Sequence, residues 1–178
     1  YLLGSSDVTF DFSTDTYKIH DHKAEPWKIT LIDTGDQTLT GGRLKRVRDY
    51  IKDEEDFCFT YGDGVSDVDI TELIAFHRLH GKSATLTATR PKGRFGAIDI
   101  VDDGTISSFN EKHDGEGAWI NGGFFVLKPC VIDRIISDET SWEGEPLAGL
   151  ANDGELVAYK HSGFWQPMDT LYEKNQLN

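Results

Sequence analysis

Two aspartates carry the strongest chemical signal in this sequence of 178 residues. Asp63 follows the apolar run 57–61 and lies between two glycines, which let a backbone approach a phosphate closely. Asp169 ends the segment 163–169, whose bulky apolar residues are unusual for a surface loop, and a carboxylate there is costly without a partner. Mg²⁺ is such a partner, since it accepts one or two carboxylates plus phosphate oxygens. Asp63 and Asp169 are therefore candidate ligands of a Mg²⁺ ion.

Both aspartates also have structural interpretations, which the sequence leaves open. Asp63 could be an ordinary turn residue, and Asp169 could cap the helix that follows it. Asp67 and Asp69 form a second acidic pattern, Asp-Val-Asp, which could also bind a metal. Asp69 is better explained as a helix N-cap, because a Glu three residues later completes a capping-box pattern.

A strand–helix–strand pattern positions Asp63. The run 57–61 is short and continuously apolar, which predicts a strand buried on both faces. A helix follows from residue 70, with His77 on its apolar face as a core residue, and a strand returns at 84–89. Such units make a sheet largely parallel, and open α/β sheets bind ligands outside the carboxyl ends of their strands. Asp63 is expected at that edge.

The rest of the chain is typical of further α/β elements. Asp103-Gly104 between two alternating runs is a strong hairpin signal. Strands are expected at 8–12, 27–32, 97–101, 105–109, 124–127 and 156–159, and helices after 41–42, from 129, around 146–151 and after 169. The sequence contains no repeats, low-complexity tracts or Pro-rich linkers. We therefore predict a single domain spanning 1–178, with an inserted β-hairpin.

Composition excludes several classes of protein. The formal net charge of −13 argues against a nucleic-acid partner, since phosphate backbones are bound by basic surfaces. No apolar run approaches the roughly 18 residues of a membrane span. Two cysteines without metal-ligand spacing indicate neither a disulfide framework nor a zinc site, which favours a cytoplasmic location. The chain begins without Met, so we expect it to start partway through a longer protein.

Other polar and aromatic residues have mostly structural interpretations. Lys45 and Arg48 are expected on the solvated face of a helix. Trp119 and Trp165 could stack on a base or sugar, although core packing is the more common role of a Trp. The six histidines show no catalytic pattern and no serine lies in a nucleophile elbow, which favours chemistry without a covalent intermediate. The sequence leaves open whether Glu143 touches the site.

Four motifs, in order along the chain, resemble those of the sugar-phosphate nucleotidyltransferase family. They are Phe-Thr-Tyr-Gly-Asp-Gly at 59–64, Glu-Lys at 111–112, Asn-Gly-Gly-Phe at 121–124 and Gly-Phe-Trp-Gln-Pro-Met-Asp-Thr at 163–170. The segments 33–44 and 85–89 are similar to the same family, so the resemblance covers nearly the whole chain. The string Trp-Gln-Pro-Met-Asp favours the branch of the glucose-1-phosphate cytidylyltransferases. The resemblance implies a Rossmann-like three-layer α/β fold with a mostly parallel mixed sheet.

The resemblance also implies a reaction. Glucose 1-phosphate would attack the α-phosphate of CTP and give CDP-glucose and pyrophosphate, with Mg²⁺ as cofactor. The attacking phosphate oxygen is already anionic, so no general base is required. Such transfers depend on positioning and on charge neutralisation, which suits the residue types found here.

The motifs assign a role to each matching residue. Asp63 and Asp169 would hold the Mg²⁺, and Lys112 would neutralise the sugar phosphate, so these three are the expected catalytic residues. The expected binding residues are, for the nucleotide, Thr38, Arg43 and Gly62, and, for the sugar hydroxyls, Glu111 and Asn121. Members of the family are commonly oligomeric, so we expect a homo-oligomer whose partners are the small molecules CTP and glucose 1-phosphate.

One feature of the family has no counterpart in this sequence. The family begins with a strand, a Gly-rich loop of the Gly-Gly-x-Gly-Thr-Arg-Leu kind and a Pro-Lys-Pro segment, which cradle the triphosphate. The expected domain therefore lacks the N-terminal Gly-rich nucleotide-binding loop. Three alternatives stay open: transfer from UTP or dTTP, a GT-A type glycosyltransferase that uses Asp67-Val68-Asp69, and a non-catalytic nucleotide-sugar-binding homologue.

Overall fold

The computed structural model describes residues 6–22, 27–90, 97–100, 105–110 and 118–177. By its internal contacts the chain separates into two compact units, Tyr1–Asp33 and Thr34–Asn178. The single domain spanning 1–178, which the absence of linker-like composition indicates, stays a prediction. Each unit has its own strands, and each is considered by itself.

The first unit contains one antiparallel hairpin. Strand β1, Ser6–Asp11, pairs with β2, Thr16–His22, and a strand close to the predicted 8–12 is thereby confirmed. The strand predicted at 27–32 is wrong: this segment has no regular secondary structure, and Leu31 is 92% exposed. Its apolar residues are typical of a strand, but no strand of the described chain pairs with its backbone groups.

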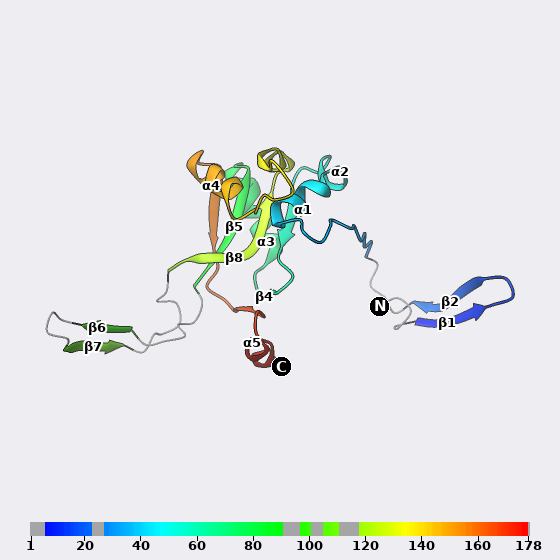
Figure 1. Ribbon diagram of the computed structural model, residues 1–178, viewed down its shortest axis with the longest axis horizontal. Helices are drawn as coiled ribbons and strands as arrows, with labels where there is room; N and C mark the ends of the chain where they lie inside the picture. Colours follow the sequence, from blue (N-terminus) through cyan, green and yellow to red (C-terminus); the bar gives the residue numbers. More distant parts are fainter. Residues whose placement is uncertain (1–5, 23–26, 91–96, 101–104, 111–117, 178) are drawn as a thin grey trace. The chain divides into compact units, whose positions relative to one another are not determined.

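A mixed four-stranded sheet forms the centre of the second unit (Figure 1). Its strands, in spatial order, are β3 (Phe57–Thr60), β8 (Ile120–Leu127), β5 (Ala84–Thr89) and β9 (Leu156–Lys160). β8 runs antiparallel to both of its neighbours, whereas β5 and β9 are parallel. β3, β5 and β9 therefore share one direction, as the predicted strand–helix–strand unit requires, but β8 lies between β3 and β5.

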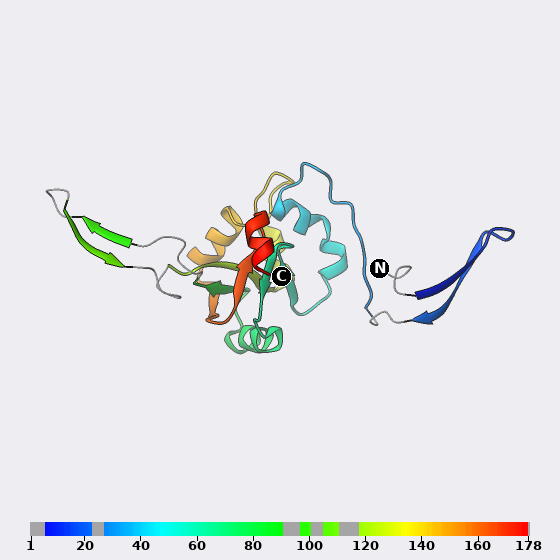
Figure 2. The same ribbon diagram turned by 90° about the horizontal axis from the view of Figure 1, so that it is seen from below.

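Helices cover both faces of this sheet, which confirms the three-layer α/β fold. The helices of the second unit are α1 (Thr40–Arg46), α2 (Arg48–Ile51), α3 (Ile70–His80), the 3₁₀ helix η1 (Pro129–Arg134), α4 (Glu145–Asn152) and α5 (Leu171–Gln176), of which α5 packs against β10 (Trp165–Pro167) of a small separate sheet. α3 covers one face, where its Phe76 contacts Tyr159 of β9 with ring centroids 5.3 Å apart. α1, η1 and α4 contribute buried residues to the other face. Figure 2 shows α3 on the opposite side of the strands from α1.

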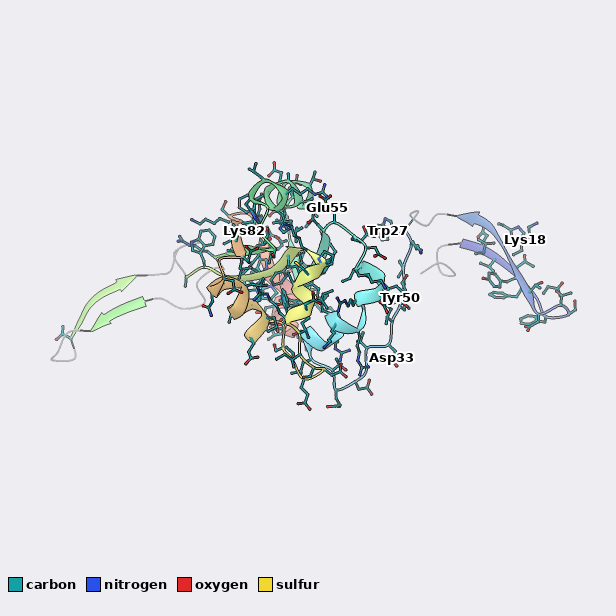
Figure 3. All side chains as sticks on the ribbon, turned by 90° about the horizontal axis from the view of Figure 1, so that it is seen from above. Lys18, Trp27, Asp33, Tyr50, Glu55 and Lys82 are labelled. Carbon is teal, nitrogen blue, oxygen red and sulfur yellow. The ribbon has the colours of Figure 1, made fainter. Side chains whose placement is uncertain are left out.

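The main core lies between the sheet and the group α1, η1 and α4. Phe125 and Leu127 of β8 face this side together, because alternate residues of a strand point the same way. Trp142 is fully buried, and its ring centroid lies 6.0 Å from that of Phe125 and 6.1 Å from that of Phe59. The cluster, whose side chains are drawn in Figure 3, is completed by Leu44, Ala84, Val131, Ile132, Ile135 and Leu150.

β3 is less buried than its sequence predicts. The apolar run 57–61 predicts a strand buried on both faces, but burial alternates along β3, and Cys58 and Thr60 are exposed. In the described part of the chain β3 pairs with β8 alone, so it is an edge strand of this sheet. The prediction is wrong because an apolar run shows which residues tolerate burial, and not which neighbours cover them.

Two short sheets complete the second unit. β4 (Gly64–Ser66) pairs antiparallel with β10 (Trp165–Pro167), and no sequence pattern predicts this pairing. β6 (Ala97–Ile100) and β7 (Ile106–Asn110) form the predicted inserted hairpin, although the turn at 103–104 lies outside the described residues. In the described chain, every helix is too short or too polar to cross a membrane.

His77 is a core residue, as its position on an apolar helix face predicts. Its side chain is completely buried, with Nδ1 2.7 Å from Thr85 Oγ1 and Nε2 3.2 Å from Asp56 Oδ1. Burial lowers the pKa of His77 below its usual 6.5, although the nearby Asp56 carboxylate acts in the opposite direction. The imidazole is therefore neutral at neutral pH.

Acid should destabilise the protein through His77. The unfolded chain takes up a proton near pH 6.5 whereas the folded chain resists it, so the free energy of unfolding falls as the pH drops below about 6.5. We expect the urea midpoint to fall between about pH 8 and about pH 5, and to fall less steeply in His77→Gln. The control is His20→Gln, at an exposed position of the first unit, which should keep the wild-type slope. Equal slopes in wild type and His77→Gln would contradict this role of His77.

Candidate active site

The carboxyl ends of β3, β5 and β9 meet at one edge of the central sheet, and antiparallel β8 begins there. The residues at this edge are Tyr61 after β3, Asn121 near the start of β8, Arg90 after β5 and Lys160 at the end of β9. Asn121 pairs with Ala88 of β5, and Ala88 also pairs with Lys160. This is the edge at which open α/β sheets bind ligands.

The β4–β10 pair brings the two predicted metal ligands to the same place. The Met168 N–H donates to the Asp63 carbonyl oxygen at 2.8 Å, which extends the ladder between the two strands. Asp169 is the next residue, so both aspartates lie at one end of this small sheet. The Trp165 Nε1–H donates to the Gly122 carbonyl oxygen at 2.7 Å, which attaches β10 to the start of β8. The backbone thus joins two segments that are far apart in the sequence.

The interpretation of Asp169 as a helix cap finds no support, whereas Asp63 does lie in the bend between β3 and β4. Thr170 is the N-cap of α5: its hydroxyl accepts from the Glu173 N–H at 3.2 Å, and the Glu173 carboxylate accepts from the Thr170 N–H at 2.9 Å. Asp169 is therefore not needed as a cap. Asp63 and Asp169 are both exposed, and neither carboxylate bonds to another described residue. Both are available to a ligand.

This pair of carboxylates suits magnesium as a donor set. Mg²⁺ prefers oxygen ligands and is usually held by one or two carboxylates, waters and substrate phosphates. In the described part of the chain, no group of three or more His, Cys, Asp or Glu residues could hold a metal ion. Asp63 and Asp169 alone would leave most coordination positions of the metal open. They therefore fit a Mg²⁺ ion whose other ligands are substrate phosphates and water molecules.

The second acidic pattern has structural partners. The Asp69 carboxylate accepts from the Glu72 N–H at 3.0 Å and caps α3, as predicted. Asp67 Oδ1 lies 2.9 Å from His161 Nε2, within hydrogen-bonding distance. This pair ties the end of β4 to the segment after β9. The Asp-Val-Asp pattern is thus explained without a metal.

A hydrogen-bond network that the sequence does not predict surrounds Tyr61, directly before the Asp63 loop. The Tyr61 hydroxyl donates to Glu143 Oε1 at 2.6 Å and accepts from Asn121 Nδ2 at 3.2 Å. The second Glu143 oxygen accepts from the hydroxyls of Thr40, at 2.7 Å, and Ser141, at 2.5 Å. Tyr61 and Glu143 are 82 positions apart, so no local pattern reveals their contact.

Hydrogen bonding sets the charge states within this network. Burial disfavours the Glu143 carboxylate, but bonds from Ser141, Tyr61 and Thr40 lower its pKa below the usual value. Burial and the bond to Glu143 raise the pKa of Tyr61, so its hydroxyl keeps its proton. An ionised Glu143 thus holds Tyr61 and, through Tyr61, the side-chain amide of Asn121.

Tyr61 and Glu143 should be energetically coupled. Tyr61→Phe removes the hydroxyl that joins Glu143 to Asn121, and Glu143→Gln removes the charge that accepts three hydroxyl groups. Because the side chains are in contact, we expect a coupling free energy of about 0.5–3 kcal/mol in a double-mutant cycle of urea unfolding. The control pairs Glu143→Gln with Tyr50→Phe, at a tyrosine that is 61% exposed, and should be additive. Additivity of Tyr61→Phe with Glu143→Gln would instead contradict the network.

The three predicted nucleotide-binding residues differ in their surroundings. Thr38 is 7% exposed, and its methyl group packs beside Gly42, so little of its side chain faces solvent. The exposed Arg43 guanidinium donates to Thr34 Oγ1 at 2.7 Å, which holds the loop before α1. A Cβ at Gly62 would meet no atom within 4 Å. Packing therefore does not explain glycine at 62, which agrees with close approach of a ligand.

Asn121 is the one predicted sugar-binding residue that the structure describes. Its Oδ1 accepts from the Gly123 N–H at 2.8 Å, and its Nδ2 donates to Tyr61, so the amide is oriented by the chain itself. Glu111 and Lys112 lie outside the described residues, and their roles stay predictions.

The basic residues after Arg43 bind the chain itself. Lys45 Nζ donates to two backbone carbonyl groups directly after η1, each at 2.9 Å. Arg46 pairs with Asp138 at 2.6 Å, and Arg48 forms a salt bridge to η1. These contacts support the interpretation that Lys45 and Arg48 are structural residues and not a phosphate-binding patch.

Comparison with known proteins defines the class to which this fold and site belong. The family model described as Nucleotidyl transferase matches residues 13–165. The chain therefore belongs to the nucleotidyl transferase family.

Individual relatives show which members of the family this chain resembles. The chain is 60% identical over 177 residues to the glucose-1-phosphate cytidylyltransferase of Salmonella typhi, across 99% of this chain and 68% of that protein. It is 42% identical to the probable glucose-1-phosphate cytidylyltransferase of Bacillus subtilis, across 100% of this chain and 69% of that protein. The resemblance predicted from the motifs is confirmed.

A solved structure shows the same fold. The crystal structure of HddC from Yersinia pseudotuberculosis matches with a TM-score of 0.57 and 21% identity, across 78% of this chain and 60% of that chain. The chain thus spans only part of the length of the proteins that it matches.

Proposed function

We propose that the enzyme containing this chain transfers a cytidylyl group from CTP to α-D-glucose 1-phosphate, giving CDP-glucose and pyrophosphate. The observation that carries the proposal is the 60% identity, over 99% of the chain, to the Salmonella typhi protein of that name. The backbone pairing that joins the Asp63 and Asp169 segments supports it, because this transfer needs charge neutralisation around the phosphates.

The reaction requires positioning and charge control from the protein. A phosphate oxygen of the sugar phosphate attacks the α-phosphorus of CTP, the bond to the β-phosphate breaks, and pyrophosphate leaves with the electron pair. The attacking oxygen is already an anion, so no side chain has to remove a proton. Mg²⁺, when bound, would offset the negative charge of the phosphates. Asp63 and Asp169 would hold it at the end of the β4–β10 sheet.

The remaining residues would bind the two substrates. We assign Arg43, Gly62 and the Thr38 loop to the nucleotide side, with the open space above Gly62 as the support for close approach. Lys112 would neutralise the sugar phosphate. Glu111 and Asn121 would bind sugar hydroxyls, and Asn121 is already oriented by its bonds to Gly123 and Tyr61.

We also propose a cytoplasmic enzyme that forms homo-oligomers. Cys58 and Cys130 are free thiols, which agrees with a reducing compartment. The oligomer is supported by the family resemblance, and sedimentation of the full-length enzyme tests it.

Pyrophosphate release by the full-length enzyme tests the function. Glucose 1-phosphate and Mg²⁺ are supplied with CTP, UTP or dTTP in separate reactions, and we expect release with CTP. If pyrophosphate is released with UTP or dTTP but not with CTP, the enzyme is a nucleotidyltransferase and the proposal of CTP as its substrate is wrong. Absence of release with all three, together with calorimetric binding of CDP-glucose, would favour a non-catalytic nucleotide-sugar-binding protein.

A further inference from the structure

The Glu143 carboxylate joins two segments that carry proposed substrate-binding residues. One of its oxygens accepts from the Thr40 hydroxyl of α1 at 2.7 Å, and the other accepts from the Tyr61 hydroxyl, after β3, at 2.6 Å. Glu143 is 103 positions from Thr40 and 82 from Tyr61 along the chain. It also lies outside the four motifs that resemble the family. Its contacts therefore point to a role that the motifs do not reveal.

On the side proposed for the nucleotide, Glu143 holds the start of α1. Thr40 is the first residue of this helix, and its hydroxyl also accepts from the Trp142 N–H at 2.9 Å. Arg43 lies three positions further along the same helix, so Thr40 and Arg43 are neighbours on its surface. Movement of Thr40 away from Glu143 would therefore displace Arg43, which is proposed to bind the nucleotide.

On the side proposed for the sugar, Glu143 acts through Tyr61 on the amide of Asn121. The Tyr61 hydroxyl accepts from Asn121 Nδ2 at 3.2 Å, and Asn121 Oδ1 accepts from the Gly123 N–H at 2.8 Å. The Tyr61 ring packs closely on β8, because Gly123 has a φ of +79° and a Cβ there would lie 2.8 Å from Tyr61 Cδ2. An amide has two donors and two acceptor lone pairs, so these bonds within the described chain leave one of each. That oriented pair matches a sugar hydroxyl, which both accepts and donates.

A neutral side chain of the same shape cannot replace the Glu143 carboxylate. A carboxylate only accepts hydrogen bonds, and here it accepts from three hydroxyl groups. The amide of a glutamine has one donor end, which, if directed at Tyr61, would meet a hydroxyl that already accepts from Asn121. Directed at Thr40, it would meet a hydroxyl that already accepts from the Trp142 N–H. In either orientation one side loses its bond, and the other keeps a weaker bond to an uncharged oxygen.

We propose that Glu143 is a positioning residue for both substrates, which holds α1 on the nucleotide side and, through Tyr61, the Asn121 amide on the sugar side. The inference rests on the proposed function, which supplies the two substrates. In this scheme Glu143 acts through Thr40 and Tyr61, and not by its own contact with a substrate. Because these two partners serve different sides, removing them one at a time should affect one substrate each.

Steady-state kinetics of the full-length enzyme, with each substrate varied in turn, test the proposal. Tyr61→Phe should raise KM for glucose 1-phosphate about three- to tenfold, as expected for the loss of one hydrogen bond, and leave KM for CTP within about twofold. The Tyr61 N–H keeps its bond to the Gly123 carbonyl oxygen, at 3.3 Å, so the adjacent Gly62 should stay in place. Thr40→Val should raise KM for CTP by a similar factor and leave KM for glucose 1-phosphate within about twofold. Glu143→Gln should raise both KM values.

Two control variants separate positioning from a loss of folded protein. Unfolding of part of the enzyme lowers the apparent kcat but leaves KM unchanged, so a rise in KM reports on the active molecules. Thr40→Ser keeps the hydroxyl and should keep KM for CTP near its wild-type value. Glu139→Gln is the matched control, because Glu139 is an exposed glutamate of the same segment whose carboxylate bonds to no other residue that the structure describes. Both of its KM values should equal those of the wild type.

Unchanged KM values in Glu143→Gln would overturn the inference while the proposed function stands. A rise in only one KM value in this variant would overturn its role for both substrates. Equal rises of both values in Tyr61→Phe and in Thr40→Val would also overturn it, since they indicate a general disturbance of the site; if Glu143→Gln does not fold, these two variants decide. If the wild type releases no pyrophosphate, the proposed function fails. Calorimetric titrations of both substrates into wild type and Glu143→Gln then decide the positioning role: equal affinities overturn it, and weaker binding of both supports it.

Discussion

Asp63→Asn and Asp169→Asn should each abolish turnover while leaving the fold intact. Each change removes one of the two carboxylate charges that would hold Mg²⁺, and a catalytic metal contributes several kcal/mol of charge stabilisation. Because about 1.4 kcal/mol corresponds to a factor of ten, we expect kcat/KM to fall about a hundredfold or more. Both side chains are exposed, so the free energy of unfolding should change by less than about 0.5 kcal/mol. Pyrophosphate release and urea unfolding measure the two effects.

Asp67→Asn is the matched control for these variants. Asp67 is also an exposed aspartate near β4, but it pairs with His161 and not with the proposed metal. It should therefore keep near-wild-type turnover. Wild-type rates in Asp63→Asn or Asp169→Asn would reject that residue as a metal ligand. Loss of turnover in Asp67→Asn alone would favour a glycosyltransferase-like use of the Asp-Val-Asp pattern.

Gly42→Ala should destabilise the second unit, although replacing glycine by alanine normally stabilises a helix. Alanine in a helix is usually more stable than glycine by about 0.5–1 kcal/mol. At residue 42, however, a Cβ would lie 2.5 Å from the Asp138 carbonyl oxygen and 2.6 Å from the Asp138 Cα. α1 is held this close to the segment at 138–140 by the bond from the Leu39 N–H to the Asp138 carbonyl oxygen, at 2.9 Å. We expect a loss of about 1–3 kcal/mol, measured by urea unfolding.

Gly62→Ala is the control for Gly42→Ala and separates packing from ligand binding. A Cβ at Gly62 meets no atom within 4 Å, so the free energy of unfolding should change little. If a phosphate approaches this backbone, KM for CTP should rise. A stable Gly42→Ala would show that α1 can move away from Asp138. An unstable Gly62→Ala would show that the loop before Asp63 is more tightly packed than the structure indicates.

Local sequence patterns predicted most helices and strands of the second unit. α3 is the clearest case, because the Asp69 cap and the apolar face that buries His77 are both encoded within about a dozen neighbouring residues. The inserted hairpin is confirmed for the same reason, since its signal is a two-residue turn between alternating runs.

Sequence patterns gave wrong predictions where the formation or burial of a strand depends on which other strands pair with it. The segment 27–32 has strand-like residues but forms no strand, and β3 is an edge strand although its residues are apolar enough for a central one. β4 and β10 are three residues each, too short for any periodicity, yet their pairing is what joins the segments of Asp63 and Asp169. Backbone pairing is a property of two segments, and a pattern in one segment cannot reveal it.

The sequence by itself determined the helices and strands of α/β type, the motifs of the nucleotidyltransferase family and the residue types able to bind a metal and phosphates. Only the tertiary structure decided that Thr170 and not Asp169 caps α5. It also decided that Glu143 accepts a hydrogen bond from the Tyr61 hydroxyl, and that the Lys160 ammonium group lies over the Trp119 ring. The physical reason is that caps, periodicity and turns act over a few neighbouring residues, whereas these contacts depend on strand order and register across the whole sheet.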